Sequence, residues 1–402
     1  MLAFEEALAR VLAVVPAPRG ETVFLSEAPG RVLADQIRSP IDLPSFDNSA
    51  MDGYAVRAAD VASAKPASPA TLRLAGKVAA GEVFAGKLAA GTCVRLFTGS
   101  PLPPGADAVV MQEDTHTDSG APGDVLILAP AGAGENVRAR GEDVKQGTIL
   151  VEAGKVLSPG QIGLLAAAGF ERLRVGRQPV VGLVATGSEL TEPGTPLSPG
   201  RIYESNRTAL AALMKRVGAI PTTFPLVADV LDGTSQVLLE AFNQCDAVVT
   251  SGGVSVGEMD FLKQAFEQIG GRLELWKVAM KPGRPFVFGR YRERLLFGLP
   301  GNPVSALVTF LLLVRPALLR RQGATDVSSP AHPGVLAEPL TNPGERRHFM
   351  RIKVDPTGKV QSAGLQASHV LSSLAAANGL VDVPPHTTLA AGSAVTVLRW
   401  EG

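Results

Sequence analysis

Apolar runs of strand length alternate with helical patterns from residue 178 to residue 320, and this alternation constrains the fold more than any other feature of the chain. Strands are expected at residues 180–184, 222–226, 247–250, 277–280, 285–288 and 295–297, and helices at 206–217, 233–243, 261–268 and 303–320. Strands that alternate with helices in this way form a parallel sheet with helices on its faces. We therefore expect a central parallel α/β sheet domain over residues 177–325.

Three of the expected strands end in polar residues. Glu189 follows the first strand, Asp229 follows the second, and the sequence SGGVSVGEMD follows the third at residues 251–260. Ligands of open α/β sheets bind beyond the carboxyl ends of the strands. The sequence therefore predicts that these groups meet at one edge of the sheet.

The SGGVSVGEMD segment has the features of a phosphate-binding turn. Its small residues let the backbone approach a ligand, and its hydroxyls add donors; they are Ser251, Gly252, Gly253, Ser255 and Gly257. The helical pattern that follows supplies unpaired N–H groups and a positive dipole end. Asp260 adds a carboxylate, and carboxylate with phosphate is a usual ligand set for Mg²⁺. An ordinary βα turn is the alternative.

Other domains flank the α/β region. Short strand-like runs separated by Gly and Pro from about residue 40 to 150 predict an inserted β domain at 43–144. Helical patterns at 3–15 and from Ser158 predict an N-terminal helical or linker domain at 1–42 and 145–176, in which the two helices pair. Short strands after the prolines at 330 and 333 predict a C-terminal β barrel at 326–402.

Composition excludes several classes of protein. Lys plus Arg equals Asp plus Glu, 38 each, so no global field attracts nucleic acid or an anionic membrane. Two cysteines argue against a disulfide framework. The acidic start contradicts a signal peptide, and the apolar run 304–314 is too short to span a bilayer and indicates a buried helix. We expect a cytoplasmic protein that binds neither nucleic acid nor membrane.

Further polar segments have both a structural and a functional interpretation. The segment 44–56, with Asp52, is either a hydrogen-bonded loop or a ligand site, and RARGEDV at 138–144 is either a salt-bridge cluster or a phosphate and metal site. Lys277 and Lys281 flank an expected strand, which would place both on one side. The corner LPGNPVS at 299–305 is either a Pro-Gly turn or an anion-binding helix start. The barrel contributes four residues able to bind anions, Arg347, Arg351, Ser368 and His369.

Taken in order, these segments resemble the molybdopterin molybdotransferase family, of the bacterial MoeA type related to the gephyrin E domain. The matching strings, which run from about residue 40 to 375, are FDNSAMDGYAV, TGSPLPPGADAVVMQE, RARGEDV, ATGSEL, SGGVSVGEMD, KPGRPF, GLPGNPVSA and SHVLSS. The full set in this order is highly specific. One departure is Ala139, where the family often has a third basic residue.

The resemblance implies four domains, a homodimer, and an active site between the α/β domain of one subunit and the β insertion of the other. It implies a reaction that takes molybdate and adenylylated molybdopterin, inserts the metal at the dithiolene and releases AMP with Mg²⁺. The partners implied are the molybdopterin adenylyltransferase and maturation factors of downstream molybdoenzymes.

The resemblance also implies roles for single residues, carried over by motif. Asp52, Thr98 and Asp143 are expected to reach in from the partner subunit, and Glu189, Asp229 and Asp260 to hold Mg²⁺. Lys277 and Lys281 are expected to bind phosphate or oxyanion, and the molybdate pocket is expected to consist of Lys281, Ser305, Arg351 and Ser368. The residues assigned to catalysis are Asp260, Asp52, Asp143, Lys277 and Lys281.

Two other functions remain open at this point. A molybdopterin adenylyltransferase could use the α/β domain alone, but the motif at 47–56 argues against it because that smaller type of enzyme does not need it. A binding scaffold without activity, like the gephyrin E domain, is the second alternative.

Overall fold

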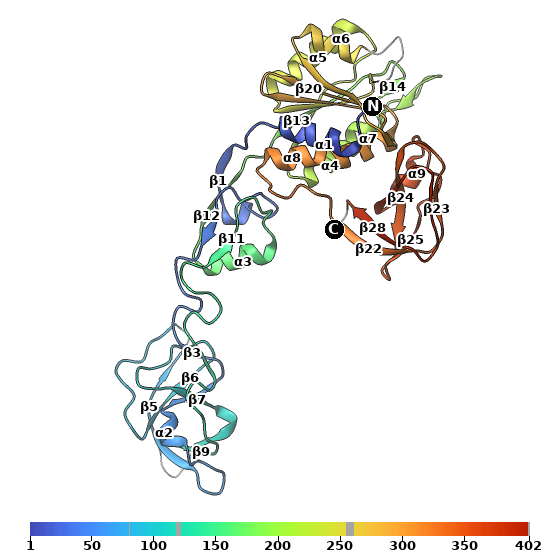
Figure 1. The fold of residues 1–402 in the computed structure, drawn as a ribbon. Coiled ribbons are helices and arrows are strands. Elements are labelled where there is room, and N and C mark those ends of the chain that lie inside the picture. Colours follow the sequence, from blue (N-terminus) through green and yellow to red (C-terminus); the bar gives the residue numbers. More distant parts are fainter. Residues whose placement is uncertain (80, 118–121, 255–260, 401–402) are drawn as a thin grey trace. The chain divides into compact units, whose positions relative to one another are not determined.

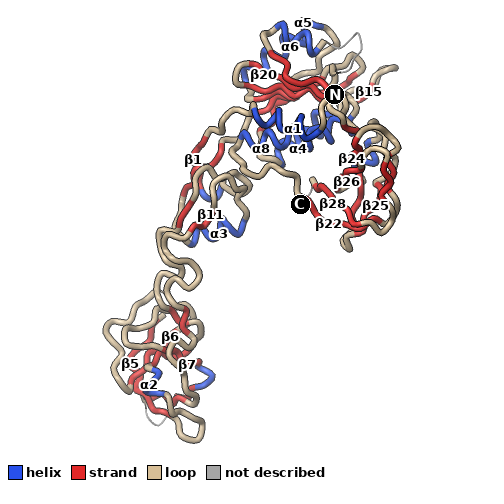
Figure 2. Tube along the Cα trace, in the orientation of Figure 1, coloured by secondary structure: helices blue, strands red, loops and turns tan. Residues whose placement is uncertain are grey.

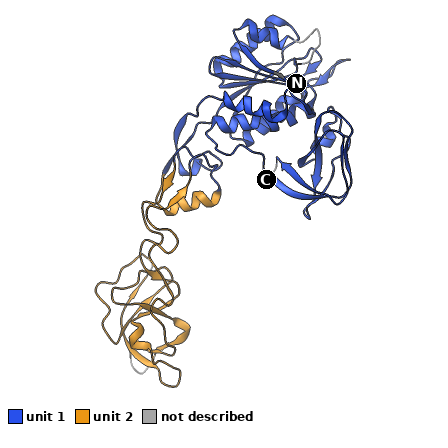
Figure 3. Cartoon of the chain, viewed as in Figure 1, with its two compact units in different colours: residues 1–35, 153–158, 172–402 blue, residues 36–152, 159–171 orange. Residues whose placement is uncertain are grey.

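The computed structural model describes residues 1–79, 81–117, 122–254 and 261–400. They fall into two compact units (Figure 3). Unit 1 comprises residues 1–35, 153–158 and the chain from 172 onward, and unit 2 comprises residues 36–152 and 159–171.

Six strands form the central sheet of unit 1 (Figure 1). In spatial order they are β16 (Ile220–Thr223), β13 (Val180–Ala185), β17 (Ala247–Ser251), β21 (Arg294–Leu299), β20 (Pro285–Tyr291) and β18 (Arg272–Lys277). The first four run parallel, β20 is antiparallel to β21, and β18 is antiparallel to β20. Only Arg292 and Glu293 separate β20 from β21, so this connection is a hairpin, which antiparallel strands alone can use. The sheet is therefore mixed, and its parallel part carries the strand ends singled out from the sequence.

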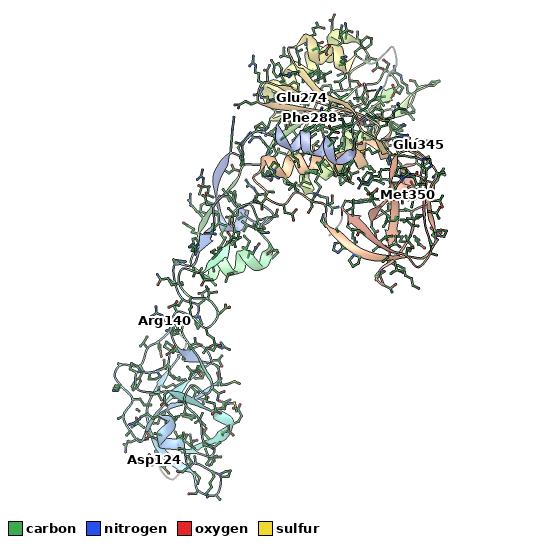
Figure 4. All side chains as sticks on the ribbon, in the orientation of Figure 1. Asp124, Arg140, Glu274, Phe288, Glu345 and Met350 are labelled. Atoms are coloured by element: carbon green, nitrogen blue, oxygen red, sulfur yellow. The ribbon has the colours of Figure 1, made fainter. Side chains whose placement is uncertain are left out.

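Helices cover both faces of this sheet. One face carries α5 (Leu231–Gln244) and α6 (Leu262–Gln268), and the other carries α1 (Phe4–Ala13), α4 (Asn206–Arg216), α7 (Pro303–Thr309) and α8 (Arg315–Arg321) (Figure 1). Neighbouring strand residues point to opposite faces, so Val248 joins the core beneath α5 while Val249 joins the core on the side of α1. Phe288 lies in that second core with its ring 5.3 Å from the ring of Phe297 (Figure 4). Both faces are apolar because both are buried.

The expected helix at 303–320 is one continuous helical stretch, Pro303–Arg321, with a π-helical segment at Phe310–Val314 between α7 and α8. In the described part of the chain it is the one helix long and apolar enough to cross a membrane, and 78% of its most apolar window is buried inside the protein. Its apolar residues belong to the core beside α1. It is thus a core helix by its packing, as the sequence predicted.

The N-terminal helix does not form the predicted pair with the helix that follows Ser158. Ala7 and Val11 of α1 are fully buried in the α/β core, where α1 packs against α8 and the π-helical segment. The second helix, α3 (Pro159–Ala167), packs on β11 (Ile149–Val151) in unit 2. The periodic apolar stripe of each helix shows that it has a buried face but does not specify the partner.

The C-terminal part of unit 1 is a barrel-like sheet. Five of its strands pair in a closed ring, β24 (Arg347–Val354), β25 (Lys359–Ser362), β22 (Ala331–Leu336), β28 (Ala394–Arg399) and β26 (Gly379–Val383). Met350 belongs to its core (Figure 4), and so does Ile352. The sequence did not reveal the two-stranded pair β23 (Leu340–Asn342) and β27 (Thr387–Leu389), nor β19 (Met280–Lys281), which pairs with β24 and so joins the α/β sequence to the barrel.

Unit 2 is built on a curled six-stranded sheet (Figure 2). In spatial order its strands are β7 (Ala108–Met111), β4 (Gly53–Val56), β6 (Thr92–Leu96), β5 (Ala70–Val78), β9 (Asp124–Ile127) and β8 (Thr115–Thr117). Short helix α2 (Ala58–Val61) and two strand pairs accompany it, β3 (Asn48–Ser49) with β10 (Val137–Arg138) and β2 (Ile37–Arg38) with β11. In unit 1, β1 (Gly20–Phe24) pairs with β12 (Arg172–Gly176).

Candidate active site

Three strand ends of the parallel sheet line one cleft with a volume of about 670 Å³. The chain leaves β13 through Thr186 and Gly187, leaves β17 through Gly252 and Gly253, and leaves β21 through the segment 300–302, and all of these residues line the cleft. Glu189 after β13, Asp229 after β16 and Ser251 at the end of β17 line the same cleft, so within the described residues these predicted groups do meet at one edge of the sheet. A cleft at this edge is where an α/β sheet binds its ligands.

Three acidic residues line this cleft, Glu189, Glu204 and Asp229, and the Glu204 carboxylate already accepts hydrogen bonds from Arg207. Asp229 is held by a reciprocal pair of hydrogen bonds, because the Ser188 N–H donates to its Oδ2 at 3.0 Å and its own N–H donates to Ser188 Oγ at 3.2 Å. Glu189 precedes β14 (Leu190–Thr191), which pairs in parallel with β15 (Ile202–Tyr203). The backbone of Glu189 and Asp229 is therefore held in place by the central sheet and by the β14–β15 strand pair.

The Gly-rich turn approaches its neighbour closely. Gly252 has φ +91°, and a Cβ there would lie 2.4 Å from the carbonyl oxygen of Thr186. Only glycine combines this backbone conformation with so close an approach. The turn from β17 can therefore pass directly beside the turn from β13 and narrow the cleft.

A second cavity of about 650 Å³ adjoins the cleft. Its charged and hydroxyl side chains are Lys281, Arg284, Ser305, Arg346, Ser368 and His369. It shares Pro285, Pro300, Asn302 and His369 with the cleft, so one ligand can extend through both. We call it the basic recess.

Arg351 lies behind the basic recess rather than among the residues that line it. Its side chain is fully buried. Its Nη2 donates to the carbonyl oxygens of Leu365 and Ala367 at 2.7 and 3.1 Å, and its Nε donates to Ser373 Oγ at 2.9 Å. Within the described residues Nη1 has no hydrogen-bond partner. Arg351 thus holds the loop that brings Ser368 to the recess.

The two lysines do not flank one strand, so that prediction was wrong. Lys277 ends β18 in the central sheet, whereas Lys281 lies in β19 and pairs beside His348 of the barrel. The strand is interrupted at Val278 and Ala279 because Leu2 forms a β-bridge with Val278. The Ala279 N–H donates to the Leu2 carbonyl oxygen at 2.8 Å. Lys281 lines the basic recess, and Lys277 lines neither this recess nor the cleft.

Unit 2 brings Asp52 and Thr98 together. The N–H and the hydroxyl of Thr98 both donate to Asp52 Oδ1 at 2.8 Å, and these bonds hold the pKa of the carboxyl below its usual value. Asp143 is exposed in the turn after Arg140. Arg140 itself is anchored by Asp47, which accepts its backbone N–H at 2.7 Å, and by Asp42, which accepts its Nε at 2.6 Å (Figure 4).

The available ligands fit a magnesium ion that is shared with a phosphate. No group of three or more His, Cys, Asp or Glu side chains able to hold a metal occurs within residues 1–79, 81–117, 122–254 and 261–400. Mg²⁺ usually takes only one or two carboxylates and completes its shell with water and substrate phosphate. Glu189 and Asp229 can supply those carboxylates. The predicted residues Ser255, Gly257 and Asp260 lie outside the described residues.

Three family models match successive parts of the chain. They are described as the MoeA N-terminal region (domains I and II), which matches residues 2–169, a probable molybdopterin binding domain at 182–320, and the MoeA C-terminal region (domain IV) at 333–400. A molybdopterin molybdenumtransferase of Haemophilus influenzae is 38% identical over 99% of this chain and 98% of its own. Molybdopterin molybdenumtransferase 2 of Mycobacterium tuberculosis is 41% identical over 96% of this chain and 97% of its own.

The chain belongs to the MoeA family of molybdopterin molybdenumtransferases. Its fold agrees with this assignment. The crystal structure of a molybdopterin biosynthesis MoeA protein from Pyrococcus horikoshii OT3 matches with a TM-score of 0.85 and 30% sequence identity over 100% of both chains. The resemblance drawn from the eight sequence strings is confirmed.

Sequence reasoning missed several residues of this MoeA-type site. Thr186, Asn206 and Asn302 line the cleft, and Arg284 and Arg346 line the basic recess. Asn206 begins a helix at the same edge of the sheet as the predicted site. That position was the available signal. Arg346 had no comparable signal, because its Nη1 reaches the site region by donating to the Met280 carbonyl at 3.1 Å across a separation of 66 residues.

Proposed function

We propose that this chain is a molybdopterin molybdenumtransferase that uses molybdate and adenylylated molybdopterin and releases AMP with Mg²⁺. The observation that carries the proposal is the pair of adjoining cavities, one lined by Glu189 and Asp229 and the other by Lys281, Ser305 and Ser368. The acidic cleft suits a metal-bound phosphate, and the basic recess suits a tetrahedral oxyanion. A donor of molybdenum and an adenylylated acceptor need these two environments side by side.

Each cavity contributes differently to the proposed reaction. In the cleft, the Gly252 turn and Ser251 bind the pyrophosphate and hold it in position for attack. The reaction depends on this positioning and needs no covalent nucleophile from the protein. Mg²⁺, when bound, polarises the phosphoryl oxygens. In the recess, Lys281 and the two serines replace the hydration shell of molybdate, and Arg351 keeps the loop of Ser368 in place. We assign Lys277 to phosphate binding and Asp260 to metal binding on the sequence motifs alone, because Lys277 lines neither cavity and Asp260 lies outside the described residues.

The proposal extends to the assembly. We infer a homodimer of four-domain chains in which Asp52, Thr98 and Asp143 complete the site of the partner, and a cytoplasmic location. The molybdopterin adenylyltransferase and the maturation factors of molybdoenzymes are the proposed protein partners. Since the curated relatives that match nearly the whole chain are named molybdopterin molybdenumtransferases, an adenylyltransferase or an inactive scaffold is not favoured.

Replacing Lys281 tests the proposal. Loss of one charge-assisted contact to an oxyanion costs about 1.5–3 kcal/mol, so Lys281→Met is expected to lower molybdate-dependent AMP release by roughly 10- to 100-fold. The matched control is Lys353→Met, which removes an exposed lysine from β24. Product is quantified with molybdate, without molybdate, and with EDTA. Release of AMP by the wild-type protein that depends on neither molybdate nor Mg²⁺ contradicts the proposal, as does unchanged turnover of Lys281→Met.

A further inference from the structure

Asn206 presents an unusual combination of contacts in the cleft. Its side chain is only 7% exposed, yet it lines the cavity. Its Nδ2 donates to Ser251 Oγ at 2.7 Å and to the Gly301 carbonyl oxygen at 2.7 Å. No described residue donates to its Oδ1, which is buried.

The two contacts of Nδ2 fix the orientation of the amide. A carbonyl oxygen can only accept a hydrogen bond, so the group that faces Gly301 must be the NH₂. Flipping the amide would place Oδ1 against the Gly301 carbonyl oxygen, another acceptor, and lose that bond, although the Ser251 hydroxyl could still donate to Oδ1. Oδ1 therefore stays an acceptor, and a buried acceptor without a partner costs about 1–3 kcal/mol.

A second oxygen in the same cleft repeats the pattern. Thr186 is also 7% exposed and lines the cavity, and its Oγ1 has no partner among the described residues. The position of a Cβ built on Gly252 lies 3.2 Å from this Oγ1, which places it next to the Gly-rich turn. Two residues that line the cleft thus each have a buried oxygen without a partner among the described residues, beside the carboxylates and the Gly-rich turn.

We propose that Asn206 is a specificity-determining residue whose Oδ1 accepts a hydrogen bond from an N–H or NH₂ group on the heterocycle of the bound substrate. The inference rests on the proposed function, which supplies two such heterocycles, the pterin and the adenine. Phosphate and molybdate lack nitrogen donors and leave this acceptor unsatisfied. Asn206 also orients Ser251, because the hydroxyl that accepts from Nδ2 keeps its own hydrogen free to donate to a phosphate oxygen.

The test compares ligands with and without the donor. AMP is paired with purine riboside 5′-monophosphate, which lacks the amino group, and 6-carboxypterin is paired with its 2-dimethylamino-3-methyl derivative. Affinities are measured by titration calorimetry on the full chain. The wild-type protein is expected to prefer the donor-bearing member of one pair by roughly 10-fold, and that pair identifies which heterocycle Asn206 contacts.

Variants assign the preference to one atom. Asn206→Ala is expected to abolish it, whereas Asn206→Asp, which keeps an acceptor, is expected to retain it with weaker overall affinity. Thr208→Ala is the control, because Thr208 is exposed on the same helix and does not line the cleft. Wild-type protein that binds both members of each pair equally overturns the inference without any variant.

The outcomes separate this inference from the function on which it rests. Molybdate-dependent AMP release by the wild-type protein, together with no preference in either pair, overturns the role of Asn206 alone. A preference that survives in Asn206→Ala has the same consequence. Absence of molybdate-dependent AMP release in the wild-type protein overturns the proposed function, while a preference that depends on Asn206 would still establish a site for a nitrogen heterocycle.

Discussion

At the scale of single residues, His348 is the least satisfied polar side chain around the basic recess. It is 2% exposed, and neither Nδ1 nor Nε2 has a hydrogen-bond partner among the described residues. Burial, followed by the nearby charges of Lys281, Arg351 and Arg346, lowers its pKa to about 4. The folded protein therefore keeps the His348 imidazole neutral among positively charged side chains.

This neutral histidine predicts acid sensitivity. In the unfolded chain the imidazole binds its proton near its ordinary pKa of 6.5. The contribution of the neutral His348 to the free energy of unfolding is therefore fully present above pH 6.5. It is lost as the pH falls from 6.5 towards 4. At pH 5 the loss amounts to about 2 kcal/mol.

His348→Leu is thus expected to flatten the dependence of the melting temperature on pH between 7.5 and 4.5. The exposed His332 provides the control variant His332→Gln. Parallel curves for wild-type protein and His348→Leu contradict the assignment.

At the scale of elements, the ribbon of β14 and β15 is fastened to α4 by a buried ion cluster. Arg207 is 4% exposed and donates from Nε to Glu204 Oε2 at 3.0 Å. Its Nη2 donates to both carboxylate oxygens of Glu192 at 2.7 Å. Glu204 is 3% exposed, while the side chain of Glu192 is 51% exposed. The cluster fixes the ribbon that begins next to Glu189.

Removing the arginine leaves the Glu204 carboxylate buried without its counter-charge. Arg207→Met is therefore expected to lower the free energy of unfolding by about 3–5 kcal/mol. The double variant Arg207→Met/Glu204→Met is expected to regain most of that loss, because it removes both charges together. Glu192→Gln is the control and costs less than about 1 kcal/mol, since exposed pairs contribute little.

Denaturant unfolding of the four proteins checks this prediction. A double variant that is less stable than Arg207→Met contradicts the explanation by an unpaired charge. AMP release measured on the same proteins shows whether the ribbon also positions Glu189.

The elements also show where sequence reasoning succeeds and where it stops. The helix 206–216 and the strand 247–251 were predictable because local periodicity and turn residues define them. The break between β18 and β19 was not, because Leu2 creates it from the far end of the chain. The hairpin at Arg292 was also not predicted from the sequence, because its turn contains no Gly, Asn or Asp, the residues typical of such turns.

The same distinction holds for the candidate site. Glu189, Asp229 and Ser251 were found from the sequence because they follow strands whose ends must share one edge. Asn206 and Arg346 were missed, since their relation to the cavities depends on contacts with Gly301 and Met280, far away in the chain. The place of Arg351 behind its loop likewise depends on tertiary packing.

At the scale of the whole molecule, the proposed residues are divided between the two compact units. Asp52 and Thr98 belong to unit 2, and Lys281 and Glu189 belong to unit 1. If the site is completed by the partner subunit, each protomer gives its unit 2 residues to the other. Two chains that are inactive for different reasons can then form one intact site.

Mixed dimers test this division directly. Asp52→Asn and Lys281→Met are each expected to lose most activity alone, and the two chains carry different affinity tags so that mixed dimers can be counted after coexpression. In a symmetric dimer with shared sites, random pairing makes half of the dimers mixed, and each mixed dimer holds one intact site. Recovered activity of about a quarter of the wild-type value is therefore expected.

Pairing Asp52→Asn with Thr98→Val, two changes within unit 2, must restore nothing, because every site then contains a defect. Mixed dimers of Asp52→Asn and Lys281→Met that form in the expected proportion but stay inactive would show that each site is built from a single chain.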